Sequence, residues 1–218
     1  LLTYLLKVYM KVISVLNQKG GCGKTTIATN LAVSLSRHYS VLLADANSTQ
    51  ASASDWYEAG GQEYVDCVSV DNASMIKSIK RVGSNYDFVV IDTSPTKNEL
   101  AAACITESNL VLMPVQPSPY DLWACADLVS LIKQRQQITN GQPLSKFVIN
   151  AAKVGTNSFQ ELRSEIEEYG IKRMKSVLYR RESYIKTATL GSGVVMSNDT
   201  KAKSEFEGLY QEVLEILK

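Results

Sequence analysis

The chain has 218 residues, of which 45% are hydrophobic, and this is enough for one α/β domain with a full core. Its formal net charge of +1 excludes a uniformly basic protein, so any binding to nucleic acid must come from a local patch. The single histidine excludes a histidine-rich metal site, and the four cysteines form no C-x-x-C pair.

The apolar runs and the cysteines together indicate where in the cell the protein is located. No apolar run approaches the roughly 18 residues that a membrane span requires. Residues 1–9 are apolar but short, and they lack the basic start and the small-residue cleavage site of a secretory signal. Without such a signal, free thiols in a reducing cytosol are expected for the cysteines. The sequence therefore predicts a cytoplasmic protein that has no membrane partner.

The first predicted elements enclose a glycine-rich turn. A buried strand is expected over Val12–Leu16, and apolar residues at helical spacing follow from residue 27 to residue 35. Between them lies the run Lys19-Gly20-Gly21-Cys22-Gly23-Lys24-Thr25-Thr26. Its end fits the phosphate-loop template G-x-x-x-x-G-K-[ST], although Gln18 stands where the strict template has glycine. Because strand, turn and helix follow one another as this motif requires, the run predicts a phosphate site rather than a plain turn.

The chemistry of the run follows from its residue types. Glycines let backbone N–H groups converge on phosphate oxygens, and the N-terminus of the helix adds a partial positive charge. Lys24 can reach the β- and γ-phosphates, and the hydroxyl of Thr25 can bind Mg²⁺. We therefore expect a nucleoside triphosphate, bound by residues 19–26, and Mg²⁺, bound partly by Thr25.

The rest of the chain alternates between predicted strands and helices. Strands are expected over residues 40–45, 64–70, 87–92, 110–115, 146–150 and 173–178, and helices over residues 50–60, 74–82, 118–137, 158–169, 182–189 and 200–217. This alternation predicts a single doubly wound, mostly parallel sheet with helices on both faces. In the last helix, the apolar stripe from Phe206 to Leu217 is interpreted as core packing.

The phosphate loop, with a lysine at its start, resembles the deviant Walker A ATPases, the group of ParA, MinD and the nitrogenase iron protein. The resemblance extends over nearly all of the chain from Met10 and is closest to the small plasmid-partition ParA proteins. It implies that Lys19 acts in trans on the nucleotide of a second subunit, in an ATP-dependent homodimer. Since chains of this family tend to begin with Met-Lys-Val-Ile, it also implies an ATPase domain over residues 10–218 and an extra segment over residues 1–9.

Several polar residues are expected at the carboxyl ends of strands, where such sheets bind ligands. Asp92 closes an apolar strand in the Walker B pattern and can hold Mg²⁺ or a metal-bound water. The resemblance places a γ-phosphate-sensing loop over Thr93–Thr96. It also suggests that Pro117, in a Pro-x-Pro-x-Asp stretch, and Asn150 contact adenine. The alternative for the proline stretch is a plain strand-to-helix turn, with Asp121 in the first turn of the helix. Residues 96–99 only faintly resemble a guanine motif, so we expect ATP and not GTP.

The stretch from Asp45 departs from the family pattern Asp-x-Asp-Pro-Gln. Asn47 stands where the family has its second aspartate, which positions the attacking water, and the proline is missing. An amide can orient a water but cannot take its proton. The sequence therefore leaves two alternatives open: slow or lost hydrolysis with binding preserved, or replacement of the missing carboxylate by Asp45 or Asp55.

A basic run near the C-terminus is the candidate for binding DNA. Six cations fall within fifteen residues, with one acid among them: Lys172, Arg173, Lys175, Arg180, Arg181 and Lys186. Such a run can neutralise phosphates without reading sequence, and the resemblance implies nonspecific DNA binding by the ATP-bound dimer. The alternative is a solvated basic surface.

The resemblance thus implies a ParA-type ATPase that segregates plasmid or similar DNA. A centromere-binding, ParB-like partner would stimulate hydrolysis and release the nucleoid-associated dimer from DNA. Three rivals remain at this stage: a DNA clamp without turnover, a MinD-like membrane-cycling ATPase, and an iron–sulfur reductase using Cys104 and Cys125. The acidic residues of the last helix argue against the membrane rival.

Overall fold

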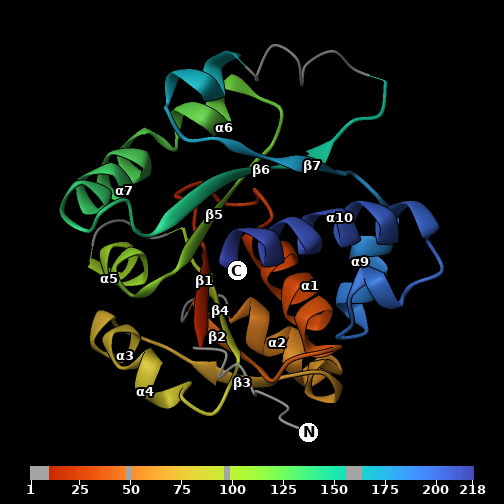
Figure 1. The fold of residues 1–218 in the computed structure, drawn as a ribbon. Coiled ribbons are helices and arrows are strands. Elements are labelled where there is room, and N and C mark those ends of the chain that lie inside the picture. Colours follow the sequence, from red (N-terminus) through yellow and green to blue (C-terminus); the bar gives the residue numbers. More distant parts are fainter. Residues whose placement is uncertain (1–9, 48–50, 96–98, 156–163) are drawn as a thin grey trace, which may run out of the picture.

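The computed structural model describes residues 10–47, 51–95, 99–155 and 164–218. In these residues seven strands form one sheet in the order β3-β2-β4-β1-β5-β6-β7 (Figure 1). Their bounds are β1 (Lys11–Val15), β2 (Val41–Ala46), β3 (Asp66–Ser69), β4 (Phe88–Thr93), β5 (Leu110–Val115), β6 (Leu144–Ala152) and β7 (Arg173–Tyr179). All neighbouring strands run parallel, which confirms the predicted doubly wound sheet.

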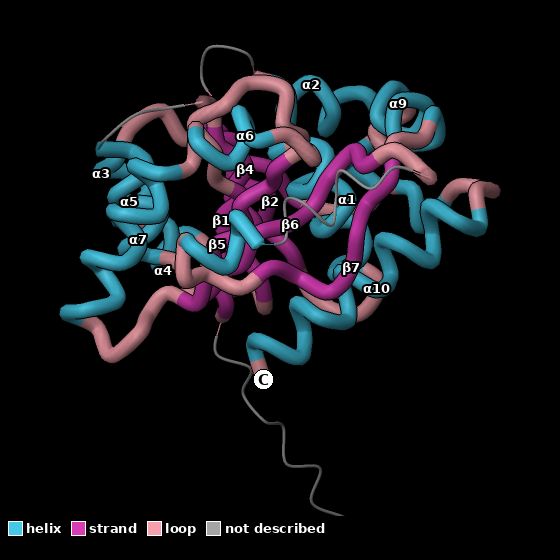
Figure 2. The backbone as a smooth tube through the Cα atoms, turned by 90° about the horizontal axis from the view of Figure 1, so that it is seen from above, coloured by secondary structure: helices cyan, strands magenta, loops and turns pink. Residues whose placement is uncertain are grey.

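Helices cover both faces of this sheet, as Figure 2 shows from above. One face packs against α3 (Ala73–Lys77), α4 (Ile79–Val82), α5 (Glu99–Glu107), α6 (Pro119–Trp123) and α7 (Ala126–Ile138). The other packs against α1 (Lys24–Ser36), α2 (Ser52–Ala59) and α10 (Thr200–Leu217), with α9 (Glu182–Thr189) beside α2. Since successive strand residues point to opposite faces, Val12 joins the first core and Ile13 the second.

The predicted helix boundaries differ from the observed ones at three places. The helix expected over residues 74–82 is divided into α3 and α4, because Ser78 closes the first turn with a bond from its N–H to the carbonyl of Met75 (3.0 Å). The helix expected over residues 118–137 is divided in the same way at Cys125, whose N–H bonds to Leu122 (2.9 Å). Helix α5 was not expected, because its alanine-rich sequence shows no clear apolar stripe.

Some expectations fall wholly or partly outside the described residues. These are the extra segment over residues 1–9, residues 48–50 of the stretch that departs from the Asp-x-Asp-Pro-Gln pattern, residue 96 of the loop after the Walker B strand, and the start of the helix expected over residues 158–169. The described end of that helix, residues 164–168, is helical as predicted. In the part of the chain that the structure describes, no helix is long and apolar enough to cross a membrane.

Helix α10 packs along the edge strand β7. Its stripe is buried through Phe206, Leu209, Tyr210, Val213 and Leu217, which confirms the core-packing interpretation. Two of its carboxylates also accept hydrogen bonds from backbone amides of β7. Glu212 accepts from Lys175 and Ser176 (2.6 Å each), and Glu205 accepts from Tyr179 (3.3 Å). The helix therefore covers both the apolar face and the free amides of this edge.

Candidate functional site

The phosphate loop joins the carboxyl end of β1 to the N-terminus of α1. Gly23 has a φ of 100°, and a Cβ on it would lie 1.9 Å from Nδ2 of Asn150. Only glycine fits there, because both the backbone conformation and the space exclude a side chain. Helix α1 begins at the next residue and has no acidic residue in its first turn. Its free N–H groups and its dipole therefore form an anion site.

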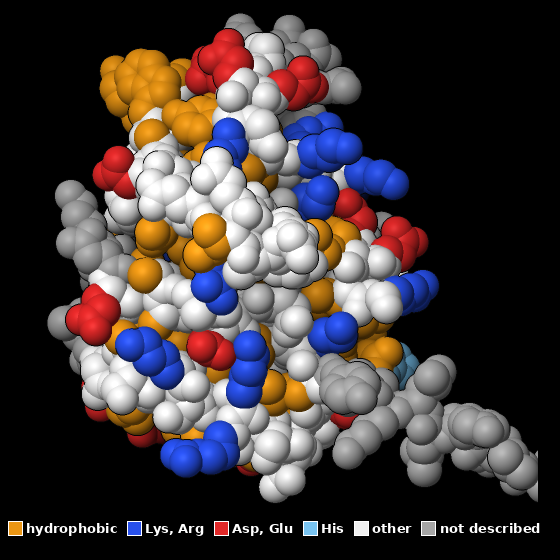
Figure 3. Space-filling model, turned by 60° about the vertical axis from the view of Figure 1, so that its left-hand side comes forward, with side chains coloured by type: hydrophobic (Ala, Val, Ile, Leu, Met, Phe, Trp, Pro, Cys, Tyr) orange, Lys and Arg blue, Asp and Glu red, His pale blue; other side chains and the backbone are white. Residues whose placement is uncertain are grey.

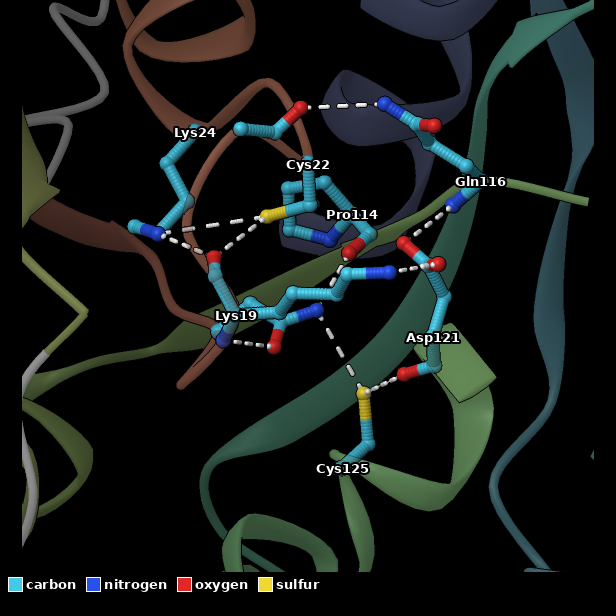
Figure 4. Close-up of polar contacts among 9 residues, drawn as sticks. Lys19, Cys22, Lys24, Pro114, Gln116, Asp121 and Cys125 are labelled. Carbon is cyan, nitrogen blue, oxygen red and sulfur yellow. Dashed lines mark hydrogen bonds and ion pairs between the residues drawn. The ribbon is translucent and has the colours of Figure 1, made fainter. Parts of the chain in front are cut away.

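Lys24 lies inside a pocket of about 310 Å³ at this loop. The pocket is lined by Gly20, Gly21, Gly23, Lys24, Thr25, Thr26, Asn47, Thr93 and Pro95. The Lys24 ammonium group donates to the carbonyl oxygen of Lys19 (2.9 Å), as Figure 4 shows. Lys24 is only 6% exposed, so its charge acts in a partly desolvated space, where it attracts phosphate more strongly than in water.

Asp92 and Thr25 form a pair of oxygen ligands beside this pocket. The Thr25 hydroxyl donates to Oδ2 of Asp92 (2.6 Å), while Oδ1 is buried without a hydrogen-bond partner among the described residues. Burial raises the pKa of Asp92 to about 7, so the carboxylate needs a cation to stay ionised at low cost. An orphaned carboxylate oxygen next to a hydroxyl fits Mg²⁺, which prefers such ligands and is completed by phosphate oxygens and water.

Asp45 lies level with Asp92 on the neighbouring strand, but its oxygens are already used. One accepts the N–H of Asn47 (3.0 Å), and the other accepts the N–H and the hydroxyl of Ser54 (2.8 Å each). Asp45 therefore fixes the start of α2. It is poorly placed to replace the missing carboxylate. Asn47 itself lines the phosphate pocket, and Asp55 lines a neighbouring hollow of about 390 Å³ with Thr25 and Thr26.

Lys19 points away from the phosphate pocket, toward Asp121 of α6 (Figure 4). Its ammonium group forms an ion pair with the Asp121 carboxylate, and the two side chains are 39% and 2% exposed. The sequence placed Asp121 only in the first turn of a helix, in the Pro-x-Pro-x-Asp stretch. The sequence did not predict this pair, because its two residues are 102 positions apart in the chain.

Three amide side chains hold the loop: Asn150 in β6, Gln116 just after β5, and Asn17 between β1 and the loop. Asn150 donates to the carbonyl of Cys22 (2.8 Å) and Gln116 donates to that of Gly21 (3.0 Å). Asn17 donates to the carbonyl of Pro114 (2.6 Å) and accepts the N–H of Lys19 (2.9 Å). The amide donors of Asn150 and Gln116 are thus directed at the protein backbone. Pro117 follows Gln116, two residues beyond the end of β5. The roles of Asn17 and Gln116 were missed, since isolated amides next to a motif give no signal.

The predicted DNA-binding residues are divided between the two ends of β7. Lys172, Arg173 and Lys175 lie at its amino end, where Arg173 donates to the carbonyl of Met174 (2.7 Å). Beyond its carboxyl end, Arg181 forms a two-point ion pair with Glu205. The other two residues are exposed. Arg180 lies on the surface, and the side chain of Lys186 is 75% exposed and forms an ion pair with Glu182 (3.4 Å). Figure 3 shows basic side chains gathered on one part of the surface and scattered elsewhere.

Cys104 and Cys125, the pair considered for an iron–sulfur cluster, are buried in the core. Burial raises the pKa of both thiols to about 12, so neither is a ready thiolate ligand. Within the described ranges, no three His, Cys, Asp or Glu side chains are grouped as a metal site. These cysteines are interpreted as small apolar core residues.

Comparisons with known proteins agree with this geometry. The family model "CobQ/CobB/MinD/ParA nucleotide binding domain" matches residues 13–194. The "Maintenance of carboxysome distribution protein A" of Halothiobacillus neapolitanus is 30% identical over 209 residues, which cover 93% of this chain and 95% of that protein. "Protein ParA" of Rhizobium radiobacter is 24% identical over 180 residues, or 80% and 81% of the two chains. The structure of apo McdA from Cyanothece has a TM-score of 0.76 at 17% identity, covering 94% of this chain and 99% of that one, and so shares the fold.

Proposed function

The chain belongs to the CobQ/CobB/MinD/ParA nucleotide-binding family, and on this premise we propose that it is an ATPase of DNA partition. It binds MgATP, forms a homodimer around the nucleotide, and in that state associates with nucleoid DNA without sequence preference. A centromere-binding partner of the ParB kind stimulates hydrolysis and so releases the dimer. ATP thus acts as a ligand that favours one of two states, which is how a switch works.

The observation that carries the proposal is the pair Thr25–Asp92 beside Lys24. Thr25 and Asp92 offer one hydroxyl and one orphaned carboxylate oxygen to Mg²⁺. Lys24 and the backbone amides of the loop receive the β- and γ-phosphates. When bound, Mg²⁺ neutralises charge on the phosphate oxygens. The protein holds Thr25, Asp92 and Lys24 in place before the nucleotide binds, so that little reorganisation is needed.

Dimerisation requires Lys19 to change partners. In the structure its ammonium group lies against Asp121 of the same chain. To reach the nucleotide of a second subunit, Lys19 must leave Asp121, and the negative charge of ATP is the competing attraction. We therefore propose that the Lys19–Asp121 pair belongs to the monomer and is exchanged for a phosphate contact in the dimer.

Hydrolysis is the part of the proposal that Asn47 bears on most directly. Asn47 lines the phosphate pocket and can orient an attacking water, but it cannot accept the proton. We expect turnover to be slow. A nucleotide-dependent DNA clamp is therefore the alternative function for the same site, with the same binding residues and without measurable turnover.

DNA binding is assigned to the cations at the carboxyl end of β7, which are on the same edge of the sheet as the phosphate loop. Arg180 is exposed, and the pair of Lys186 with Glu182 lies on the surface, where such pairs contribute little. Arg181 supports the surface through Glu205. Being on the nucleotide edge, these cations can be brought together by dimerisation, which would make DNA binding depend on ATP.

A second candidate function concerns the cargo. The relative from Halothiobacillus neapolitanus is named for the maintenance of carboxysome distribution, and it aligns over nearly the whole chain. The same switch on nucleoid DNA would then position a protein compartment instead of a plasmid. Loss of a plasmid from cells that lack the gene would support DNA partition, whereas clustered compartments in those cells would support the second candidate.

The experiment that tests the ATPase is phosphate release from MgATP, with and without nonspecific duplex DNA. Lys24→Ala removes the phosphate-binding ammonium group, and Lys77→Ala, an exposed lysine of α3, is the matched control. We expect turnover that Lys24→Ala abolishes and Lys77→Ala preserves. Tight ATP binding without turnover would support the clamp, and Asn47→Asp should then restore hydrolysis. If the natural chain shows no ATP binding and no turnover, the proposal is refuted.

A further inference from the structure

Two adjoining hollows lie at the amino edge of the sheet, on the opposite side from the phosphate loop. One has a volume of about 480 Å³ and the other about 370 Å³, and they share the backbone from Gly170 to Lys172. The first is lined by Ile166, Glu167 and residues 170–175. The second adds Gln136, Leu144, Ser145, Lys146 and Ile216.

Four lysines from different elements surround these hollows, and we call them the lysine cluster. Lys146 comes from β6, Lys172 precedes β7, and Lys175 lies within β7. Lys133 comes from α7, and its Nζ lies 3.2 Å from the position of a Cβ on Gly170, where the hollows meet. Three different elements, α7, β6 and β7, therefore bring positive charge to one place.

The lysine cluster has no ion-pair partner in the part of the chain that the structure describes. Two carboxylates are near: Glu167 lines the first hollow, and Glu212 accepts from the backbone of Lys175 and Ser176 and from the Ser176 hydroxyl (2.5 Å). The charge of Glu212 offsets that around Lys146 only in part. Burial, and then the charge of Lys172, lower the pKa of Lys146. An anion placed between these lysines would favour their charged forms and so oppose both effects.

The hollows are apolar as well as basic. Ile166 and Ile171, which belong to the core on the α7 face of the sheet, form a buried floor, and Leu144 is 37% exposed at the rim. Ile138, at the end of α7, is 76% exposed. A rigid DNA duplex lies across a surface and cannot insert apolar groups into a hollow. A strand cannot add to β7 either, because Glu212 occupies the amides there.

We propose that the lysine cluster and its two hollows are the docking site for an acidic segment of a partner protein. Carboxylates of the segment pair with the lysines, and its apolar side chains enter the hollows, so charge sets the orientation and the floor adds contact area. The site lies on the edge opposite the phosphate loop and shares no residue with it. Docking is therefore independent of nucleotide, and goes beyond the switch proposed above.

The test uses the full chain and a short fluorescein-labelled peptide of alternating Glu and Leu, with binding followed by fluorescence anisotropy. We compare Lys146→Glu/Lys172→Glu with Lys77→Glu/Lys201→Glu, which changes the net charge equally at exposed lysines elsewhere. The first variant should bind the peptide at least about tenfold more weakly than the control variant, because two close charge pairs become repulsive. Affinity should fall with salt and should also fall when Ser replaces Leu in the peptide.

Further arms separate the outcomes. Lys24→Ala and added MgATP should leave peptide binding unchanged, so a failure of the proposed ATPase does not affect this test. Equal loss in both double variants would refute the proposal, since net charge alone would explain it. So would duplex DNA binding that depends on Lys146 and Lys172 while the peptide does not bind. If charge reversal prevents folding, Lys133→Gln/Lys175→Gln repeats the comparison with neutral side chains.

Discussion

The two edges of the sheet use lysine in different ways. At the carboxyl edge both lysines of the phosphate loop have a partner in the chain: Lys24 donates to a carbonyl of the loop and Lys19 pairs with Asp121. At the amino edge Lys146 and Lys172 face one hollow without a carboxylate partner among the described residues. A lysine whose ammonium group is fixed by a hydrogen bond or an ion pair within the chain can bind one ligand in one defined geometry. A lysine without an ion-pair partner also attracts an anion, but it fixes the position of that anion less closely.

The sharpest way to break this comparison is to add a methyl group at a glycine on each edge. Gly23→Ala places a Cβ 1.9 Å from Asn150 Nδ2, at a φ of 100°. We expect ATP affinity to fall by more than about 100-fold, because the loop must move away from its phosphate-binding geometry. Isothermal titration with a nonhydrolysable ATP analogue measures this.

Gly170→Ala is the matched change at the amino edge. Gly170 also has a positive φ, of 63°, but the added Cβ meets only the flexible end of Lys133 at 3.2 Å. We expect a loss of about 1–2 kcal/mol in unfolding free energy from the backbone alone, and unchanged ATP affinity. Similar losses of ATP affinity in both variants would show that the carboxyl edge is no more closely fitted than the other.

A second prediction concerns the buried carboxyl of Asp92 and pH. The pKa of Asp92 is raised from 3.8 to about 7, so the folded state holds this proton to higher pH than the unfolded state. Its contribution to stability therefore falls as pH rises from about 4 to 7, and the loss cannot exceed about 4 kcal/mol. Asp92→Asn removes this dependence. The measurement is urea unfolding without nucleotide. From pH 5 to pH 8, the unfolding free energy of the variant should rise relative to that of the natural chain. An equal difference between the two proteins at pH 5 and at pH 8 would contradict the assignment.

A third prediction compares a held lysine with a free one. Lys19→Met leaves the carboxylate of Asp121, 2% exposed, without its cation, and we expect a loss of about 1–3 kcal/mol in unfolding free energy. Lys172→Met removes an exposed lysine that has no described ion pair, so the change should stay within about 0.5 kcal/mol. Adding Asp121→Asn to Lys19→Met should recover part of the loss. No recovery would mean that the pair does not hold Lys19 in the monomer.

The smallest effect is expected for DNA. Arg180→Ala should weaken nonspecific duplex binding by the ATP-bound protein several-fold and reduce the salt dependence by about one phosphate contact. Arg181→Ala should chiefly lower stability, because it leaves Glu205 without its partner. Filter binding across a salt series, together with thermal unfolding, separates the two. If Arg181→Ala changes DNA affinity as much as Arg180→Ala, the ion pair opens on binding.

The carboxyl edge was largely predictable because its chemistry is local in sequence. A strand, three glycines, two lysines and two threonines identify the phosphate loop, and an acid near the end of an apolar strand identifies Asp92. The family and the fold follow from these, and both are confirmed. What a local pattern cannot show is which distant side chain meets the loop. Asn17, Gln116 and Asp121 were therefore missed as partners, although each is close to a recognised motif.

The amino edge was not predictable for the same reason. The run from Lys172 to Lys186 is continuous in sequence, but the seven residues of β7 carry its halves to opposite edges of the sheet. Lys133 and Lys146 lie in other elements and carried no signal at all. A charge run along a strand therefore predicts the presence of positive charge, but its grouping depends on the direction of the strand.

The cover that α10 places on β7 has a consequence for synthesis of the chain. The helix is formed by residues 200–217, so β7 is complete before its amides can meet Glu205 and Glu212. During translation the newest edge of the sheet is open until the last turns of this helix leave the ribosome. An open edge is a template for strands of other chains. A released chain that stops near residue 200 would therefore expose an edge prone to aggregation, which α10 otherwise covers.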